Sequence, residues 1–243
     1  MATLLAPTPA LPALNKALGV QCFEKSRGLE QPPVDGEHIQ NLATIFVRHN
    51  AQNALGIHLI HGHFSIPENT VLLGTNFEGP KGRWAKVTGI EYVDPASVHG
   101  HIFVLSDDGL CAYEYQEGPL PDVSVVGRGF LREFVNYLVA NHLTELIGLQ
   151  VLSDCGGNQS MYELILNEGT VMLQEDAVKN CEPTRVTGWK FEAGPSGPRA
   201  CQSNETHSTM TSGNHKVFNA GKPLPKLKNV DDLKAALAVA GVI

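Results

Sequence analysis

Three of the ten histidines in this chain fall within six consecutive positions, at His58, His61 and His63. In an extended strand alternate residues share a face, so we expect His61 and His63 to project to one side and His58 to the other. Neutral imidazole is a good ligand for zinc, copper and iron. Two imidazoles on one rigid strand therefore predict part of a transition-metal site, whose remaining ligands must come from elsewhere.

Further ligand candidates lie later in the chain. Cys201, His207 and His215 follow one another in a polar segment, and a thiolate together with imidazoles favours zinc. Cys201 is the preferred third ligand because its thiolate is the softest donor. The rest of the shell stays open among Cys201, His207, His215, His99, His101 and Glu68. The alternative for each histidine is a structural role, with the ring hydrogen-bonded to a backbone carbonyl.

Two carboxylates are candidates for proton transfer. Glu114 stands between Tyr113 and Tyr115 in an apolar stretch, where burial would raise its pKa toward the range useful for an acid or base. Glu68 follows His63 by five residues, in a segment that resembles a turn. We predict that Glu114 or Glu68 is catalytic, against the simpler alternative that Glu68 is an exposed turn residue.

Composition limits the partners. The formal net charge of -7 argues against a nucleic-acid partner, and no run is long and apolar enough to predict a membrane span. A small-molecule substrate is therefore expected, and the oligomeric state stays open. Five scattered cysteines do not resemble a disulfide framework, and the first residues lack the basic region of a signal peptide. The expected location is cytoplasmic.

The 243 residues are expected to form a single domain, with a leader and short helix over 1–34, a core over 35–200, and a loop and C-terminal helix over 201–243. Apolar spacing predicts helices at about 11–18, 35–49, 129–147 and 231–240. Period-two patterns predict strands at 57–64, 70–74, 84–92, 101–105, 110–115, 162–166, 170–173 and 186–192, followed by a long polar loop. Hairpins interrupted by helices predict an α+β fold, with a single antiparallel or mixed sheet and packed helices.

Several short motifs resemble a group of small fungal proteins, sometimes labelled hemocyanin-like, that includes the cyclopenases of quinolone alkaloid biosynthesis. They are Leu59-Ile60-His61-Gly62-His63-Phe64, Ala112-Tyr113-Glu114-Tyr115, Leu146-Ile147-Gly148-Leu149, and the tail from Thr187-Gly188-Trp189 through Cys201 to His215.

For a secondary-metabolism enzyme of that group, the resemblance implies conversion of a cyclopenin-type benzodiazepinedione epoxide into a viridicatin-type quinolone, with loss of methyl isocyanate. This would be the chemistry of a zinc-dependent lyase or isomerase. On this hypothesis His61, His63 and Cys201 hold Zn²⁺, and Glu114 or Glu68 moves the proton.

Two other functions remain open. His61-x-His63 followed by Glu68 and Gly74 resembles the first cupin motif with altered glycine spacing, which would make the protein a cupin-like iron oxygenase using His61, His63 and Glu68. The third possibility is a non-catalytic small-molecule-binding protein whose histidines serve the fold.

Overall fold

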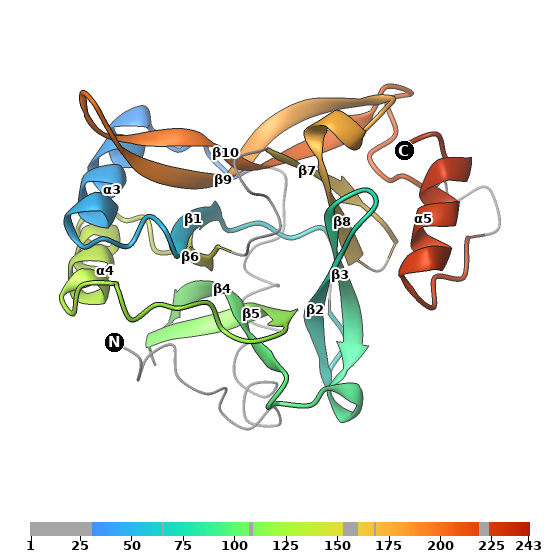
Figure 1. The fold of residues 1–243 in the computed structure, drawn as a ribbon, viewed down its shortest axis with the longest axis horizontal. Coiled ribbons are helices and arrows are strands. Elements are labelled where there is room, and N and C mark those ends of the chain that lie inside the picture. Colours follow the sequence, from blue (N-terminus) through green and yellow to red (C-terminus); the bar gives the residue numbers. More distant parts are fainter. Residues whose placement is uncertain (1–30, 65, 107–108, 153–159, 168, 219–223) are drawn as a thin grey trace.

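The protein is a closed β-barrel of ten strands in the computed structural model, which describes residues 31–64, 66–106, 109–152, 160–167, 169–218 and 224–243 (Figure 1). Around the barrel the strands follow the order β1-β6-β4-β5-β2-β3-β8-β7-β10-β9. Their bounds are β1 Leu55–Leu59, β2 Thr70–Phe77, β3 Gly82–Gly89, β4 Val98–Ser106, β5 Gly109–Glu117, β6 Ile147–Val151, β7 Met161–Ile165, β8 Gly169–Gln174, β9 Cys181–Gly194 and β10 Gly197–Met210.

The expected α+β fold with a single sheet and packed helices is therefore wrong. The barrel is mixed: β2 pairs with β5 and β7 with β10 in parallel, while the other neighbours are antiparallel. It closes where β1 pairs with both β6 and β9. The described residues contain only three α-helices, and all of them are short.

The segment expected to be a long polar loop forms β10 and the end of β9, which make the longest hairpin of the barrel. The polar residues from Glu205 to Ser208 are buried. A strand that turns polar side chains into a barrel lacks the apolar alternation by which strands are recognised. The polar pattern of residues 201–210 therefore predicts a loop, and this prediction is wrong.

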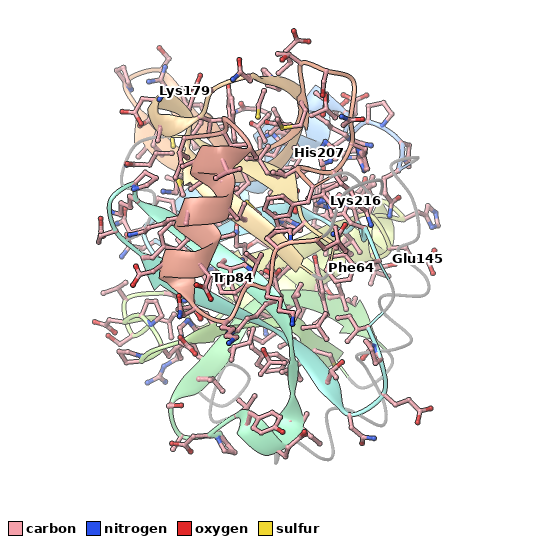
Figure 2. The ribbon with its side chains drawn as sticks, turned by 90° about the vertical axis from the view of Figure 1, so that its right-hand side faces the viewer. Phe64, Trp84, Glu145, Lys179, His207 and Lys216 are labelled. Carbon is pink, nitrogen blue, oxygen red and sulfur yellow. The ribbon has the colours of Figure 1, made fainter. Side chains whose placement is uncertain are left out.

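The helices lie on the outside of the barrel (Figure 1), where they pack against apolar side chains. The helix α3 (Gly36–Arg48) begins after Asp35, whose side chain accepts a hydrogen bond from Glu37 N as an N-cap. Phe46 of α3 contacts Phe130 of α4 (Phe130–Ala140) and Phe191 of β9, each with ring centroids 4.8 Å apart. The helix α5 (Val230–Val239) packs over the apolar cluster that contains Trp84 (Figure 2).

Other expected elements are partly confirmed. The hairpins β4–β5 and β7–β8 and the terminal helix are present, the helix with Asn229 as its N-cap. The helix expected over 129–147 ends at Ala140, and β6 begins at Ile147. His142 adopts the left-handed φ of 56°, which breaks the helix. The helix expected over 11–18 lies outside the described residues. None of the described helices is long and apolar enough to cross a bilayer.

Gly169 begins β8 where it lies against β3, and a Cβ atom there would overlap the carbonyl oxygen of Ala85. We expect Gly169→Ala to lower the free energy of unfolding by about 1–3 kcal/mol, because the backbone of one strand must shift. Gly36→Ala is the control, since a Cβ atom at Gly36 meets nothing within 4 Å. Its expected effect in urea denaturation is zero or slightly stabilising. Equal losses in the two variants would contradict the prediction.

Candidate metal centre in the barrel

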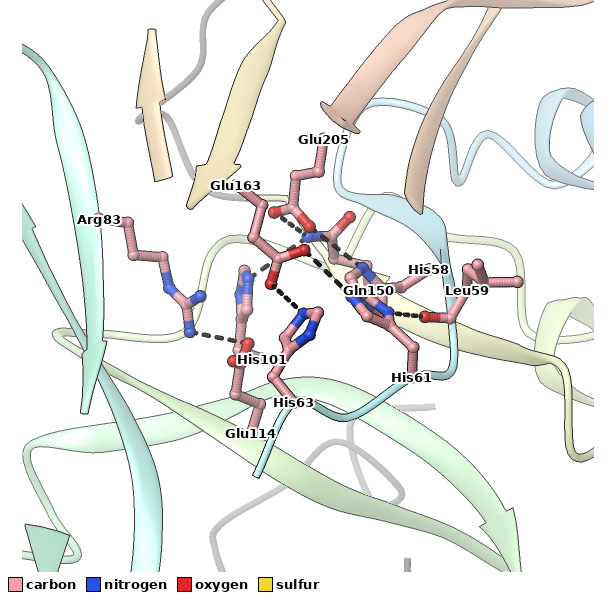
Figure 3. A network of polar contacts seen from close by, with 10 residues as sticks. All are labelled: His58, Leu59, His61, His63, Arg83, His101, Glu114, Gln150, Glu163 and Glu205. Carbon is pink, nitrogen blue, oxygen red and sulfur yellow. Dashed lines mark hydrogen bonds and ion pairs between the residues drawn. The ribbon is translucent and has the colours of Figure 1, made fainter. Parts of the chain in front are cut away.

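The interior of the barrel carries a cluster of buried polar side chains (Figure 3). They come from almost every part of the ring: His58 from β1, His61 and His63 from the segment after it, Arg83 from β3, His101 from β4, Glu114 and Gln116 from β5, Gln150 from β6, Glu163 from β7, and Glu205 and His207 from β10. Beside the cluster lies an apolar group that includes Leu72, Ile102 and Tyr113.

Glu163 lies between His61 and His63 in this cluster. Its Oε2 lies 3.0 Å from His61 Nε2, and its Oε1 lies 3.3 Å from His63 Nε2. All three side chains are at most 7% exposed. The pKa of Glu163 lies well below its usual value: burial opposes this, but His61 and His63 outweigh the effect of burial. One buried carboxylate therefore faces two imidazoles.

The ring of His61 is held by the backbone. His61 Nδ1 lies 2.7 Å from the carbonyl oxygen of Leu59 and must carry a proton to donate to it. In the neutral ring Nε2 then has only a lone pair, although it faces the Glu163 carboxylate. Burial lowers the pKa of His61, but Glu163 raises it more, so the net pKa is raised. The gap between Nε2 and Glu163 can thus be filled by a proton or by a metal ion.

The ring of His207 is also held by a hydrogen bond from its Nδ1. Thr184 Oγ1 donates to the carbonyl oxygen of His207 at 2.9 Å and so accepts the proton of His207 Nδ1 at 2.7 Å. The bare Nε2 is buried and has no hydrogen-bond partner among the described residues. Burial lowers the pKa of His207 to about 4, which keeps the ring neutral. A neutral imidazole whose second nitrogen is fixed by an acceptor is the usual state of a metal ligand.

Two groups of side chains could hold a metal ion, and they share one histidine. The first is His61, His63 and Glu163, and the second is His63, His207 and His215; in each, the candidate ligand atoms lie within 4.8 Å of one another. Pairing places these residues, because Glu163 lies opposite His207 in the parallel β7–β10 register. Lys216 forms an isolated β-bridge with Ile165 of β7, and this bridge places the adjacent His215 near the site.

A second network of polar contacts joins His58, Glu205, Gln150 and His101. His58 Nδ1 is 3.1 Å from Glu205 Oε2, and Gln150 donates to Glu205 Oε1 at 2.7 Å. Burial opposes ionisation of Glu205, but His58 holds its pKa below the usual value. The amide of Gln150 also lies 3.4 Å from His101 Nε2, and burial keeps the pKa of His101 well below its usual value. Neutral His101 thus ends a chain of contacts that starts at a buried carboxylate.

Arg83 supplies the positive charge of the interior. Its Nη2 donates to Glu114 Oε2 at 3.0 Å, and its Nε donates to Gln116 Oε1 at 2.6 Å. Among the described residues, the buried charged side chains other than histidine are this arginine and three glutamates, Glu114, Glu163 and Glu205. When the histidines are neutral, three carboxylates and one guanidinium give the interior a net charge of -2. One divalent cation would neutralise this charge.

A cavity of about 20 Å³ adjoins the first group. This is room for one or two water molecules. The polar part of its wall is formed by His58, His61, His63, Glu114, Glu163 and Thr170. The apolar residues of the wall include Phe64, Leu72, Ile102, Tyr113 and Met172. The candidate metal ligands His61, His63 and Glu163 and the carboxylate of Glu114 therefore face the same small space.

The structure brings together some of the residues singled out in the sequence. His61 and His63 meet at Glu163, and His207 and His215 lie next to His63. Cys201 is exposed on β10 and belongs to neither group. Glu68 is also exposed, whereas Glu114 is buried at the cavity. His99 Nδ1 donates to the carbonyl oxygen of Gly118 at 2.9 Å, as expected of a structural histidine.

The expected strand over 57–64 ends at Leu59, so the alternation of faces does not continue to His63. The rings of His58 and His61 stack with centroids 5.1 Å apart instead of pointing to opposite sides. That part of the prediction is wrong. The shared location of His61 and His63 results from the bend after β1 and from their common partner Glu163.

Sequence reasoning missed Glu163, Glu205, Arg83 and Gln150. A usable signal existed for Glu163, which interrupts the apolar run Met161-Tyr162-Glu163-Leu164-Ile165 as Glu114 interrupts its own. Glu205 lies in a polar segment and had no such signal.

Comparison with known proteins adds no assignment. No protein family, no curated protein and no solved structure matches this chain.

Proposed function

We propose that this protein is a zinc-dependent lyase or isomerase whose metal ion is held by His61, His63 and Glu163. The proposal depends mainly on how the ring of His61 is held. Its Nδ1 proton is committed to Leu59 O, while its Nε2 faces a buried carboxylate 3.0 Å away. Two imidazoles and one glutamate are a known ligand set of catalytic zinc, with a position left open.

The charge of the interior supports the same ion. Three buried carboxylates face one buried guanidinium among the described residues, and an uncompensated buried charge costs several kcal/mol. A divalent cation between His61, His63 and Glu163 would remove the imbalance. In its absence, protonation of His61 would offset part of it.

Zinc would supply Lewis acidity toward a carbonyl or a developing oxyanion, without redox change. Glu114 is the proposed proton carrier, because it lines the same cavity as the candidate ligands. Burial raises the pKa of Glu114, and Arg83 limits the rise. Arg83 orients the carboxylate by donating to its Oε2, which leaves Oε1 for the substrate. The apolar wall excludes bulk water from the proton transfer.

The substrate class comes from the resemblance to the cyclopenases, and we propose a benzodiazepinedione epoxide of the cyclopenin type. Its atoms balance without an oxidant, since the products are a quinolone and methyl isocyanate. A cavity of about 20 Å³ is much smaller than this molecule. Binding therefore requires the wall to open, and the half-buried Phe64 is the proposed point of movement.

The test is turnover of cyclopenin by zinc-loaded protein, with Glu114→Gln as the variant. We expect the wild type to release the quinolone and Glu114→Gln to lose about 100-fold or more in kcat, the usual contribution of a general acid or base. Glu117→Gln, an exposed change on the same strand, is the control. Unchanged turnover in Glu114→Gln would exclude the proton-transfer role, and no turnover in the wild type would exclude this substrate.

A second function has one observation in its favour. Two histidines and one carboxylate are also the ligands of non-haem iron oxygenases. In that case Glu163 takes the place that the cupin resemblance gave to Glu68. Oxygen consumption by Fe(II)-loaded protein, absent with zinc, would favour the oxygenase.

A further inference from the structure

His63 differs from the two neighbouring histidines in how its ring is held. His61 and His207 each have one nitrogen bonded to an acceptor, Leu59 O and Thr184 Oγ1 respectively. Both nitrogens of His63 are buried without a hydrogen-bond partner in the described part of the protein, and its side chain is 5% exposed. Its Nε2 lies 3.3 Å from Glu163 Oε1, at ion-pair distance. A ligand to one metal ion normally has its other nitrogen satisfied.

His63 also belongs to both candidate groups. Its ring lies 4.8 Å from that of His61 and 5.2 Å from that of His207, and His207 lies 5.1 Å from His215. Each group contains one histidine whose bare Nε2 has been fixed by a hydrogen bond from Nδ1: His61 in the first and His207 in the second. Each group therefore contains one histidine held in place by a hydrogen bond from its Nδ1, and His63 is shared between the two groups.

We propose that the barrel binds two divalent transition-metal ions bridged by the imidazole ring of His63. The first is the ion of the proposed function, on which this inference rests, at His61, His63 and Glu163. The second is held by His63, His207 and His215. The imidazole-rich second position suits zinc or copper. Its ion takes the ring nitrogen that carries the proton, so one proton is released to solvent and no electron is transferred.

The two ions have different surroundings. The cavity is lined by His61, His63 and Glu163 but not by His207 or His215. The second ion thus lies away from the reacting space. It fixes the His63 ring and attaches the turn before Lys216 to β10, because His207 lies on β10 and His215 follows that turn. The imidazolate offsets one of its two charges, and an anion or hydroxide would offset the other.

The test counts metal ions in the full chain. Apoprotein prepared with a chelator is reloaded with zinc and measured by elemental analysis, with circular dichroism to confirm folding. We expect two zinc ions per chain in the wild type, one in His61→Ala, one in His215→Ala, and two in the control His38→Ala. His38 contacts Tyr137, outside the interior cluster. His215→Gln replaces His215→Ala should that variant not fold.

Copper gives a second readout. Two Cu(II) ions bridged by one imidazolate are spin-coupled, so the EPR signal of the wild type should account for much less spin than the copper bound. His215→Ala should restore the full signal per copper. One zinc ion in the wild type that is retained in His215→Ala overturns this inference but leaves the first ion in place. Two uncoupled ions overturn the bridge, and no zinc at all overturns both proposals.

Discussion

Glu163→Gln is expected to reduce zinc affinity by at least about 100-fold, because losing even an outer-shell partner of a zinc ligand costs about 10–100-fold. The substitution keeps the size of the side chain and removes its charge. His61 Nε2 and His63 Nε2 would then face an amide in place of a carboxylate. The measurement is a competition titration with a chromophoric chelator, which gives the dissociation constant of each variant.

The matched control is Glu175→Gln. Glu175 is exposed in the turn that follows β8, and it accepts a hydrogen bond from Tyr162, the neighbour of Glu163 in the chain. It changes the net charge by the same amount without touching the interior, so zinc affinity should stay within about twofold of the wild type. Were Glu163→Gln to bind zinc as tightly as Glu175→Gln does, Glu163 would not be a ligand.

Arg83→Met is expected to lower the free energy of unfolding by about 3–5 kcal/mol, the cost of breaking a buried ion pair by removing one partner. The side chains of Arg83 and Glu114 are 3% and 6% exposed. Without the guanidinium, Glu114 stays buried with no opposite charge and must take up a proton. Urea denaturation of the metal-free protein measures the loss without contributions from metal binding.

Two further variants separate the ion pair from packing. Arg83→Met combined with Glu114→Gln should regain a large part of the loss, because the uncompensated carboxylate is gone. Arg199→Met removes the arginine of the exposed pair with Glu192 and should cost less than about 1 kcal/mol. A cost for Arg83→Met no larger than that for Arg199→Met would mean that Glu114 is neutral in the folded protein.

The sequence predicted local elements better than their assembly. Helix α3, the hairpins β4–β5 and β7–β8, and the terminal helix follow from caps, turns and periodicity within a few residues. Closure of the barrel depends on pairing between distant segments, such as Ile57 with Trp189, and no local pattern encodes it. Strand β10 could not be recognised from its sequence either, since the side chains that it buries are polar, like those of a surface loop.

For the site, too, the sequence predicted local features better than contacts between distant segments. His61, His63 and Glu114 were recognised because their types and spacing are unusual within short windows. Their partners Glu163 and Arg83 come from other strands, and only the register of the barrel brings them into contact. The softness of its thiolate favours Cys201 as a ligand, but its side chain is exposed and belongs to neither group of candidate ligands.

The pairing of β1 with β9 also determines when the interior can form during folding. It joins residues about 130 positions apart, so closing the ring has a large chain-entropy cost, and proteins rich in such distant pairings fold slowly. In the folded protein His61 follows β1, whereas Glu163 lies on β7 and His215 follows β10, so we expect them to meet only in the closed barrel. The ligands of the proposed metal ion come from segments far apart in the chain, so we expect metal binding to follow completion of the barrel.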